Sequence, residues 1–147
     1  MSEVKSETPG VLFVCVRNKG KSQMAAALAR LRGQGLIRAY SAGTNPALGQ
    51  PVNQESAAAI AEVGGNMSDE QPQGISDELL SQVDQIVVIG AEADTSELEA
   101  AGWQVTRWVT DEPSLRGIEG MERMRIIRED IDSRVQALIA EVTQAHR

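Results

Sequence analysis

The chain of 147 residues has one cysteine and one histidine, and these shortages exclude whole classes of protein. Cys15 has no second cysteine to pair with, so no internal disulfide can form, and an unpaired thiol suits a reducing compartment. We therefore expect a cytoplasmic protein. Cys15 and His146 together offer too few ligands for a zinc site, so we predict no metal centre.

Positive charge and long apolar runs are also scarce. The formal net charge of −7 argues against general nucleic-acid binding, which needs a basic face. No apolar run approaches the length of a membrane span, so we expect no membrane partner. Residues 1–10, MSEVKSETPG, lack both a periodic pattern and the apolar stretch of a signal peptide. We predict a disordered tail over 1–10 and a single domain over 11–147.

The rest of the chain alternates short apolar runs with helical patterns, which predicts an α/β fold with a parallel sheet and right-handed crossovers. The predicted strands are 11–16, 37–43, 85–90 and 103–109. The predicted helices run from Ser22 as N-cap to a stop at Gly33, over 52–65, over 76–82, and from Glu119 nearly to the end; 93–102 is helical or a turn. Ligands bind such sheets at the carboxyl ends of the strands, where CVRNKGKS (15–22) lies.

The segment 15–22 has two interpretations. Its end, Gly-Lys-Ser, resembles a nucleotide-binding loop G-x-x-x-x-G-K-[ST], but Cys15 stands where that loop needs its first glycine. A nucleotide site also needs an acid after a second apolar strand, and QIVVIG is followed by Ala91. The alternative is an oxyanion loop in which a cysteine opens the ring and a cation, here Lys21, closes it. Loop amides, the helix start and Lys21 favour this alternative, with Cys15 as a nucleophilic thiolate.

We expect the whole loop to bind the oxyanion, with a serine hydroxyl beside the sulfur. The predicted binding residues are Val16, Arg17, Asn18, Lys19, Gly20, Lys21 and Ser22. Positive charge is concentrated nearby, and we expect it to surround the thiol; the residues are Arg17, Lys19, Lys21, Arg30 and Arg32.

An acidic pair precedes a proline in the loop after the fourth predicted strand, Asp111-Glu112-Pro113. This loop is expected at the same sheet edge as Cys15, where a carboxyl group can protonate a leaving oxygen. Asp111 and Glu112 are both candidates for that role.

Together these segments resemble the superfamily of low-molecular-weight tyrosine phosphatases and thiol-linked arsenate reductases. The matching residues fall in the family's order: VLFVC (11–15), Asn18, KSQMAAALA (21–29), SAGT (41–44), QIVV (85–88) and WVTDEP (108–113). The resemblance implies a four-stranded parallel sheet of order 2-1-3-4 flanked by helices.

Departures from the family pattern narrow the expected activity. Lys21 replaces the usual loop-closing arginine and loses its bidentate fork. The tyrosine phosphatases frame their cleft with aromatic residues and carry an Asp-Pro-Tyr loop, whereas here Ser114 follows Pro113. Thioredoxin-coupled arsenate reductases have two further cysteines after the third strand, and this chain has none there. A helical glutamate that contributes to a potassium site in some relatives is replaced by Ala26.

The most specific resemblance is to the mycothiol-dependent arsenate reductases, or arsenate-mycothiol transferases, through NKGKSQMAAALA (18–29) and GMERMRIIREDIDSRVQALIA (120–140). It implies arsenate and mycothiol as substrates, a glutaredoxin-like mycoredoxin as partner, and no tightly bound cofactor. Cys15 either attacks arsenic itself or activates the incoming thiol. The implied catalytic residues are Cys15, Lys21, Ser22, Glu112 and Asp111. A tyrosine phosphatase acting through a cysteinyl-phosphate, a glutathione/glutaredoxin-linked reductase and a non-catalytic oxyanion sensor remain alternatives.

Overall fold

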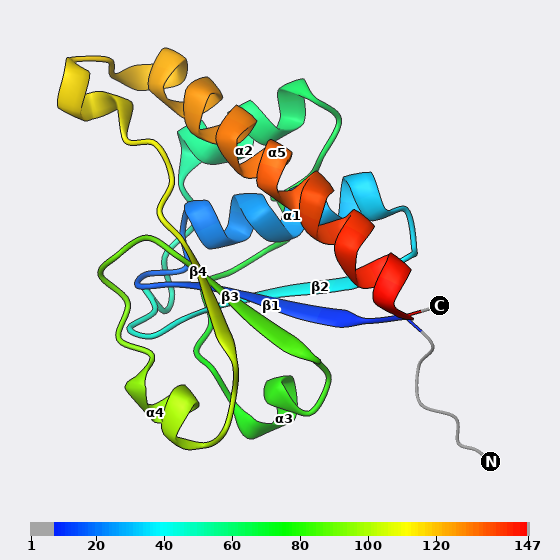
Figure 1. Cartoon of the computed structure of the whole chain (residues 1–147). Helices are drawn as coiled ribbons and strands as arrows, with labels where there is room; N and C mark the ends of the chain where they lie inside the picture. The colour runs from blue at the N-terminus through cyan, green and yellow to red at the C-terminus, as the bar shows by residue number, and fades with distance from the viewer. Residues whose placement is uncertain (1–7, 147) are drawn as a thin grey trace.

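The computed structural model describes residues 8–146 and has a four-stranded parallel sheet at its centre (Figure 1). The strands are β1 (Gly10–Cys15), β2 (Arg38–Gly43), β3 (Gln85–Ile89) and β4 (Val105–Trp108). They lie in the order β2-β1-β3-β4, and every neighbouring pair is parallel. The predicted α/β class and strand order are confirmed.

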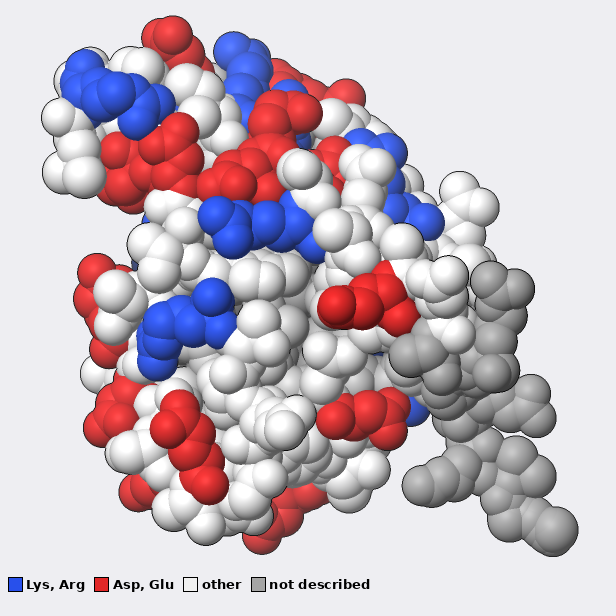
Figure 2. Space-filling model, in the orientation of Figure 1, with Lys and Arg blue, Asp and Glu red and all other residues white. Residues whose placement is uncertain are grey.

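Helices cover both faces of the sheet. The helices are α1 (Lys21–Gly33), α2 (Gln54–Glu62), α3 (Asp77–Leu80), α4 (Ser96–Ala100) and α5 (Gly120–His146), with a 3₁₀ turn, η1 (Pro113–Arg116), before the last. Figure 1 shows α1, α2 and α5 on one face and α3 and α4 on the other. Acidic and basic side chains are interspersed over the layer that contains α5 (Figure 2). Between residues 8 and 146, no helix combines the length and the apolar character that crossing a membrane requires.

The strand β1 is apolar throughout because both of its faces are buried. Val11 and Phe13 belong to the core beneath α1 and α5, while Leu12 and Val14 belong to the core on the α3 and α4 side. All four side chains are fully buried. The Phe13 ring lies 5.8 Å, centroid to centroid, from the ring of Trp108 on β4. The buried sheet therefore holds the carboxyl end of β1, and with it Cys15, in a fixed position.

The structure corrects several predicted boundaries. Residues 1–7 of the predicted tail lie outside the described part of the chain, but Gly10 belongs to β1, and the carbonyl of Pro9 accepts a 2.8 Å hydrogen bond from the amide of Arg38. The N-cap of α1 is Gly20 rather than Ser22, because the Ser22 hydroxyl contacts the sulfur of Cys15 instead. The second helix is shorter than predicted, and its N-cap is Asn53, whose side chain accepts from the amide of Ser56.

The helix α1 is rich in alanine because it packs against the sheet, α2 and α5 at once. Every residue from Ser22 to Ala29 is buried, and the four alanines among these eight residues let the neighbouring elements approach the helix closely. The far end of α1 is tied to α5 by a bidentate ion pair. Arg32 donates from Nε and Nη2 to the two carboxylate oxygens of the buried Asp132, at 2.9 and 2.7 Å.

We expect Arg32→Ala to lower the free energy of unfolding by about 1–2 kcal/mol at pH 7, because Asp132 loses two charge-assisted hydrogen bonds while it stays buried. The guanidinium holds the pKa of Asp132 below its usual range. The pair therefore stabilises the fold above about pH 4 and loses its effect as the pH falls below that value. Urea unfolding should show a smaller difference from wild type at pH 3 than at pH 7.

The control is Arg125→Ala, which removes an exposed partner of Glu62 and should lower the free energy of unfolding by less than Arg32→Ala does. An equal loss in the two variants would contradict the stabilising role of the Arg32–Asp132 pair.

Candidate active site

The loop between β1 and α1 forms a ring around the sulfur of Cys15. The half-buried thiol lies 2.8 Å from the Ser22 hydroxyl oxygen, and the amide of Asn18 donates to it at 3.3 Å. The carbonyls of residues 15, 16, 17 and 19 accept hydrogen bonds from the amides of Thr44, Asn45, Ala47 and Asn53, at 2.8 to 3.0 Å. With its carbonyls turned toward that segment, the loop can present amides on the sulfur side. This arrangement, at the start of a helix, is suited to a tetrahedral oxyanion.

A buried asparagine holds the ring in this shape. Asn18 is completely buried, and its φ of 58° lies in the left-handed region, which asparagine tolerates better than most residues. Its Nδ2 donates to the Ser22 hydroxyl at 2.8 Å. Its Oδ1 accepts from the amide of Gln73 at 2.9 Å and from Nε2 of Gln23 at 3.3 Å. Gln23 and Gln73 were not among the predicted site residues, because their contacts to the loop come from the helix interior and from a segment 55 residues away.

Gly43, at the end of β2, allows the close packing of this loop. A side-chain carbon at this position would lie 2.6 Å from the carbonyl oxygen of Val16 and 3.1 Å from Cβ of Asn18. Only glycine fits there, which gives a physical reason for the Ser-Ala-Gly-Thr segment.

The cations predicted to surround the thiol separate into two groups. Arg17, Lys19 and Lys21 line a cavity of about 280 Å³ beside the loop. Arg30 and Arg32, by contrast, lie in the last turn of α1, where Arg30 donates to the carbonyl of Ala39 and Arg32 binds Asp132. The expectation that all five surround the thiol was wrong for these two, because a helix rises about 1.5 Å per residue and carries them away from the loop.

The other predicted binding residues divide between the ring and its surroundings. Gly20 also lines the 280 Å³ cavity. Asn18 and Ser22 are buried inside the ring. Val16 lines a different and larger cavity of about 790 Å³, between the loop after β2 and the segments that carry α3 and α4. Four carboxylate residues line this larger cavity: Asp77, Glu92, Asp94 and Glu97.

The structure distinguishes the two acidic candidates. Glu112 lies beside the loop, with its Oε1 3.6 Å from Nζ of Lys21, and Arg123 of α5 donates to both of its oxygens, at 2.7 and 3.0 Å. Asp111 instead pairs with the exposed Arg116, at 2.8 and 3.2 Å. The guanidinium of Arg123 and the hydrogen bonds from Ser114 hold the pKa of Glu112 far below its usual range. The guanidinium of Arg116 lowers the pKa of Asp111. Both carboxyl groups are therefore ionised at neutral pH.

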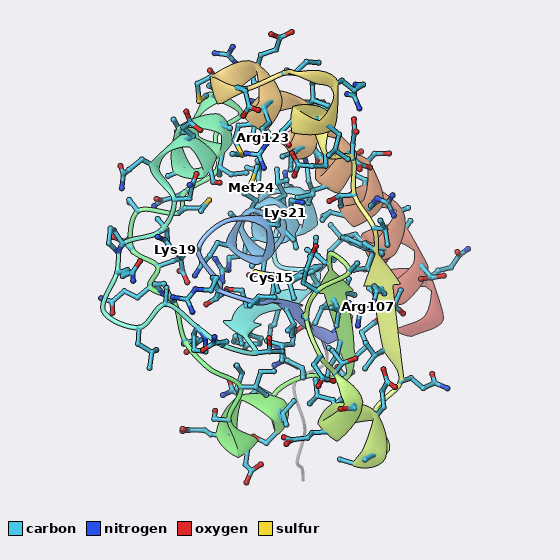
Figure 3. All side chains as sticks on the ribbon, turned by 90° about the vertical axis from the view of Figure 1, so that its left-hand side faces the viewer. Cys15, Lys19, Lys21, Met24, Arg107 and Arg123 are labelled. Atoms are coloured by element: carbon cyan, nitrogen blue, oxygen red, sulfur yellow. The ribbon has the colours of Figure 1, made fainter. Side chains whose placement is uncertain are left out.

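Arg123 is the main addition that the structure makes to the predicted site. It lines the 280 Å³ cavity together with Arg17, Lys19 and Lys21, although it lies in the first turns of α5, more than 100 residues after the loop. Figure 3 shows Cys15, Lys21 and Arg123 on the face formed by the carboxyl ends of the strands. No periodicity or spacing in the sequence distinguishes Arg123 from the other arginines of α5.

Comparisons with known proteins agree with this geometry. A protein from Halobacterium salinarum named "Putative arsenate reductase" is 35% identical over 134 residues, covering 88% of this chain and 89% of its own. An arsenate reductase from Archaeoglobus fulgidus has a similar structure (TM-score 0.68, 29% identity, 88% of this chain and 98% of its own). So does an arsenate reductase solved in a phosphate-binding state (TM-score 0.77, 26% identity, 92% and 99%). The family model described as "Low molecular weight phosphotyrosine protein phosphatase" matches residues 10–147, so the chain belongs to this enzyme family, which includes arsenate reductases among its relatives.

Proposed function

We propose that the protein joins arsenate to an external low-molecular-weight thiol, mycothiol, and that a mycoredoxin then releases arsenite. The observation that carries this proposal is the position of Cys15, the chain's one cysteine, whose sulfur contacts the amide of Asn18 and the hydroxyl of Ser22 in the loop that also carries Lys21. With no second cysteine, the chain cannot reduce arsenic through an internal disulfide. The arsenate reductases among its relatives support arsenate as the oxyanion.

The reaction divides into a transfer and a reduction. In the first step, an As–S bond forms and an As–O bond breaks, and the oxygen departs as water after it takes a proton; no electron changes hands. In the second step, a thiol of the mycoredoxin attacks the sulfur of the adduct. Arsenic(V) is reduced to arsenite, and the two sulfurs are oxidised to a mixed disulfide. Mycothiol is thus a co-substrate rather than a bound cofactor, and reduced thiols of this kind place the reaction in the cytoplasm.

The residues around Cys15 have roles in the transfer step. Lys21, Arg17 and Lys19 supply positive charge to the bound arsenate, and the Ser22 hydroxyl supports the sulfur as it gains or loses charge. Glu112 is better placed than Asp111 to protonate the departing oxygen, because it is the one that lies beside Lys21.

The charge of the larger cavity supports mycothiol over glutathione. This cavity begins at Val16, next to Cys15, and Asp77, Glu92, Asp94 and Glu97 line it. Carboxylates at that density repel the two carboxylates of glutathione, whereas their oxygens can accept hydrogen bonds from the hydroxyl groups of mycothiol, which has no carboxylate.

The aromatic residues argue against a phosphotyrosine substrate. The chain has one Phe, one Tyr and two Trp, and all four pack in the two cores; they are Phe13, Tyr40, Trp103 and Trp108. None is available to stack on a tyrosine ring at the site. A tyrosine phosphatase is therefore the weaker alternative, although the family contains such enzymes.

The decisive experiment is a coupled assay of arsenate-dependent NADPH oxidation with the complete chain. We expect turnover with mycothiol, mycoredoxin and its reductase, little with glutathione and glutaredoxin, and none with thioredoxin and thioredoxin reductase alone. Turnover with thioredoxin alone, or rapid hydrolysis of an aryl phosphate without any thiol, would contradict the proposal. Binding of arsenate without turnover under every thiol would identify an oxyanion sensor.

Lys21→Arg tests the departure from the family's loop. An arginine restores the planar fork that binds two oxygens of a tetrahedral ester. We expect hydrolysis of p-nitrophenyl phosphate to rise several-fold and mycothiol-dependent arsenate turnover to fall by a similar factor. Both rates should be measured on the same preparation, with Arg125→Lys, on the exposed surface of α5, as the control. A fall in both rates would show that lysine does not determine the choice between phosphoester and arsenate.

A further inference from the structure

The two carboxylate oxygens of Glu112 have different surroundings. Oε2 accepts from the amide and hydroxyl of Ser114 and from Nε of Arg123, so it caps the turn η1. Oε1 lies 3.0 Å from Nη2 of Arg123 and 3.6 Å from Nζ of Lys21. Oε1 thus occupies a point where a cation from α1 and a cation from α5 converge. An oxygen of arsenate or phosphate placed there would meet the same two cations.

The 280 Å³ cavity that Lys21 and Arg123 line has an excess of positive charge. Four cationic side chains line it: Arg17, Lys19, Lys21 and Arg123. Arg17 and Lys19 are hydrogen-bonded to neutral groups, the carbonyl of Asn45 and the side chain of Gln50. Glu112 pairs with the other two cations, while Glu55 and Glu119 act on Arg123 only at longer range. One carboxylate among four cations leaves a field that attracts a dianion.

We propose that Arg123 is an oxyanion-binding residue that Glu112 holds in place until substrate arrives. The entering oxyanion takes the position of Oε1 between Arg123 and Lys21 and receives the guanidinium fork. The bidentate fork that the loop lost when lysine replaced arginine at position 21 is then supplied from α5. This inference rests on the proposed function only for the identity of the oxyanion.

Release of Arg123 also lets Glu112 accept a proton. Arg123 is the largest cause of the lowered pKa of Glu112, so this pKa rises when the guanidinium moves to the oxyanion. The charged groups that act on Glu112 are Lys21 from α1, Arg123 from α5 and, in its own loop, Asp111. Glu112 takes the proton that the attacking thiol loses, or one from solvent, and gives it to the hydroxyl of bound hydrogen arsenate, which then leaves as water. The re-ionised carboxylate then pairs with Arg123 again.

Two substitutions at this ion pair should change oxyanion affinity in opposite directions. Arg123→Met removes a binding group and should lower the affinity for inorganic phosphate by at least 10-fold. The affinity is measured by calorimetry at pH 7.5 without thiol. Glu112→Gln keeps a carbonyl oxygen that can cap η1 but removes the competing charge, so phosphate binding should tighten several-fold. The control is Arg125→Met, which removes an ion pair between Glu62 and the arginine two residues after Arg123 on α5. It should leave the phosphate affinity within 2-fold of wild type. Titration with arsenate should give the same order.

A merely structural ion pair would behave differently. Arg123→Met and Glu112→Gln would then shift phosphate affinity in the same direction or leave it unchanged, and either result overturns the inference. If Arg123→Met does not fold, Arg123→Lys can replace it, because lysine keeps the charge but lacks the fork. This variant should lower the phosphate affinity by a smaller factor, and an unchanged affinity would also overturn the inference. In the mycothiol assay, Glu112→Gln should lower kcat by about 10²-fold while phosphate binds more tightly, a combination that loss of stability does not produce.

The outcomes separate this inference from the proposed function. If phosphate affinity follows the predicted order but arsenate is not turned over with any thiol, the oxyanion-binding role of Arg123 stands and the proposed activity fails. If arsenate is turned over with mycothiol but Arg123→Met binds phosphate like the wild type, the activity stands and the role of Arg123 fails.

Discussion

Cys15→Ser should lower mycothiol-dependent arsenate turnover by at least about 10³-fold, because both routes for the transfer step need the sulfur. A serine hydroxyl is a far weaker nucleophile than a thiolate at neutral pH, and it cannot replace the thiolate in activating an incoming thiol. The binding groups remain, however: the loop amides, Lys21 and Arg123 do not depend on the sulfur. Phosphate affinity should therefore stay within a few-fold of wild type while turnover is lost.

The control for this variant is Ser22→Ala, which removes the hydroxyl 2.8 Å from the sulfur but keeps the nucleophile. We expect a reduction of about 10- to 100-fold, since one hydrogen bond at a reacting group is lost. Intact mass spectrometry after arsenate addition shows whether arsenic is attached to Cys15 in the wild type. Substantial turnover by Cys15→Ser would mean that the external thiol attacks arsenic unaided and would remove Cys15 from the mechanism.

Much of the fold could be predicted because buried parallel strands leave a clear mark in a sequence. Continuous apolar runs such as VLFVC arise because both faces of β1 are covered, and the alternation with helices identifies the class. The strand order, in contrast, could not be predicted from these apolar runs. It followed from the family resemblance, since apolar runs do not reveal which strands are neighbours. Element ends were less accurate, because a capping side chain such as Ser22 can make a more specific contact elsewhere.

The sequence could place the loop residues, which are consecutive, but not the residues that contact the loop from elsewhere in the fold. The 15–22 loop and its thiol could be read from spacing, because a strand end followed by a helix start fixes the geometry. The expectation that Arg30 and Arg32 surround the thiol was wrong because nearness in sequence was taken for nearness in space, although the predicted helix already placed them at its far end. Arg123 and Gln73 come from distant segments, and only tertiary packing brings them to the loop.

The choice between Asp111 and Glu112 shows the same limit. Both precede Pro113, and both were open from sequence alone. The 3₁₀ turn η1 turns Glu112 inward, where its side chain caps the turn and meets Arg123, and leaves Asp111 to pair with the exposed Arg116. The strongly lowered pKa of Glu112 could not be predicted from the sequence, because it depends on a guanidinium from another helix.

Asn18→Ala should lower the free energy of unfolding by about 3 kcal/mol and weaken phosphate binding by about 10²-fold. The substitution removes a fully buried side chain whose hydrogen bonds connect the Ser22 hydroxyl and the amide of Gln73. Those two groups stay buried or half-buried without this partner, at a cost of about 1–3 kcal/mol. Alanine also tolerates the left-handed φ of 58° less well than asparagine, which adds about 1 kcal/mol. Urea unfolding and phosphate calorimetry measure the two effects.

Two further substitutions at this position separate the backbone from the side chain. Asn18→Gly removes the same hydrogen bonds but accepts the left-handed backbone, so it should recover about 1 kcal/mol relative to alanine without recovering phosphate affinity. Asn18→Asp keeps the acceptors for Gln73 and Gln23 but loses the donor to Ser22 and adds negative charge beside the sulfur. It should therefore bind phosphate at least as weakly as Asn18→Ala, and its fully buried charge should leave it no more stable than that variant. Wild-type affinity in Asn18→Gly would show that the ring keeps its shape without this side chain, and that the carbonyl contacts to residues 44–53 alone determine the oxyanion site.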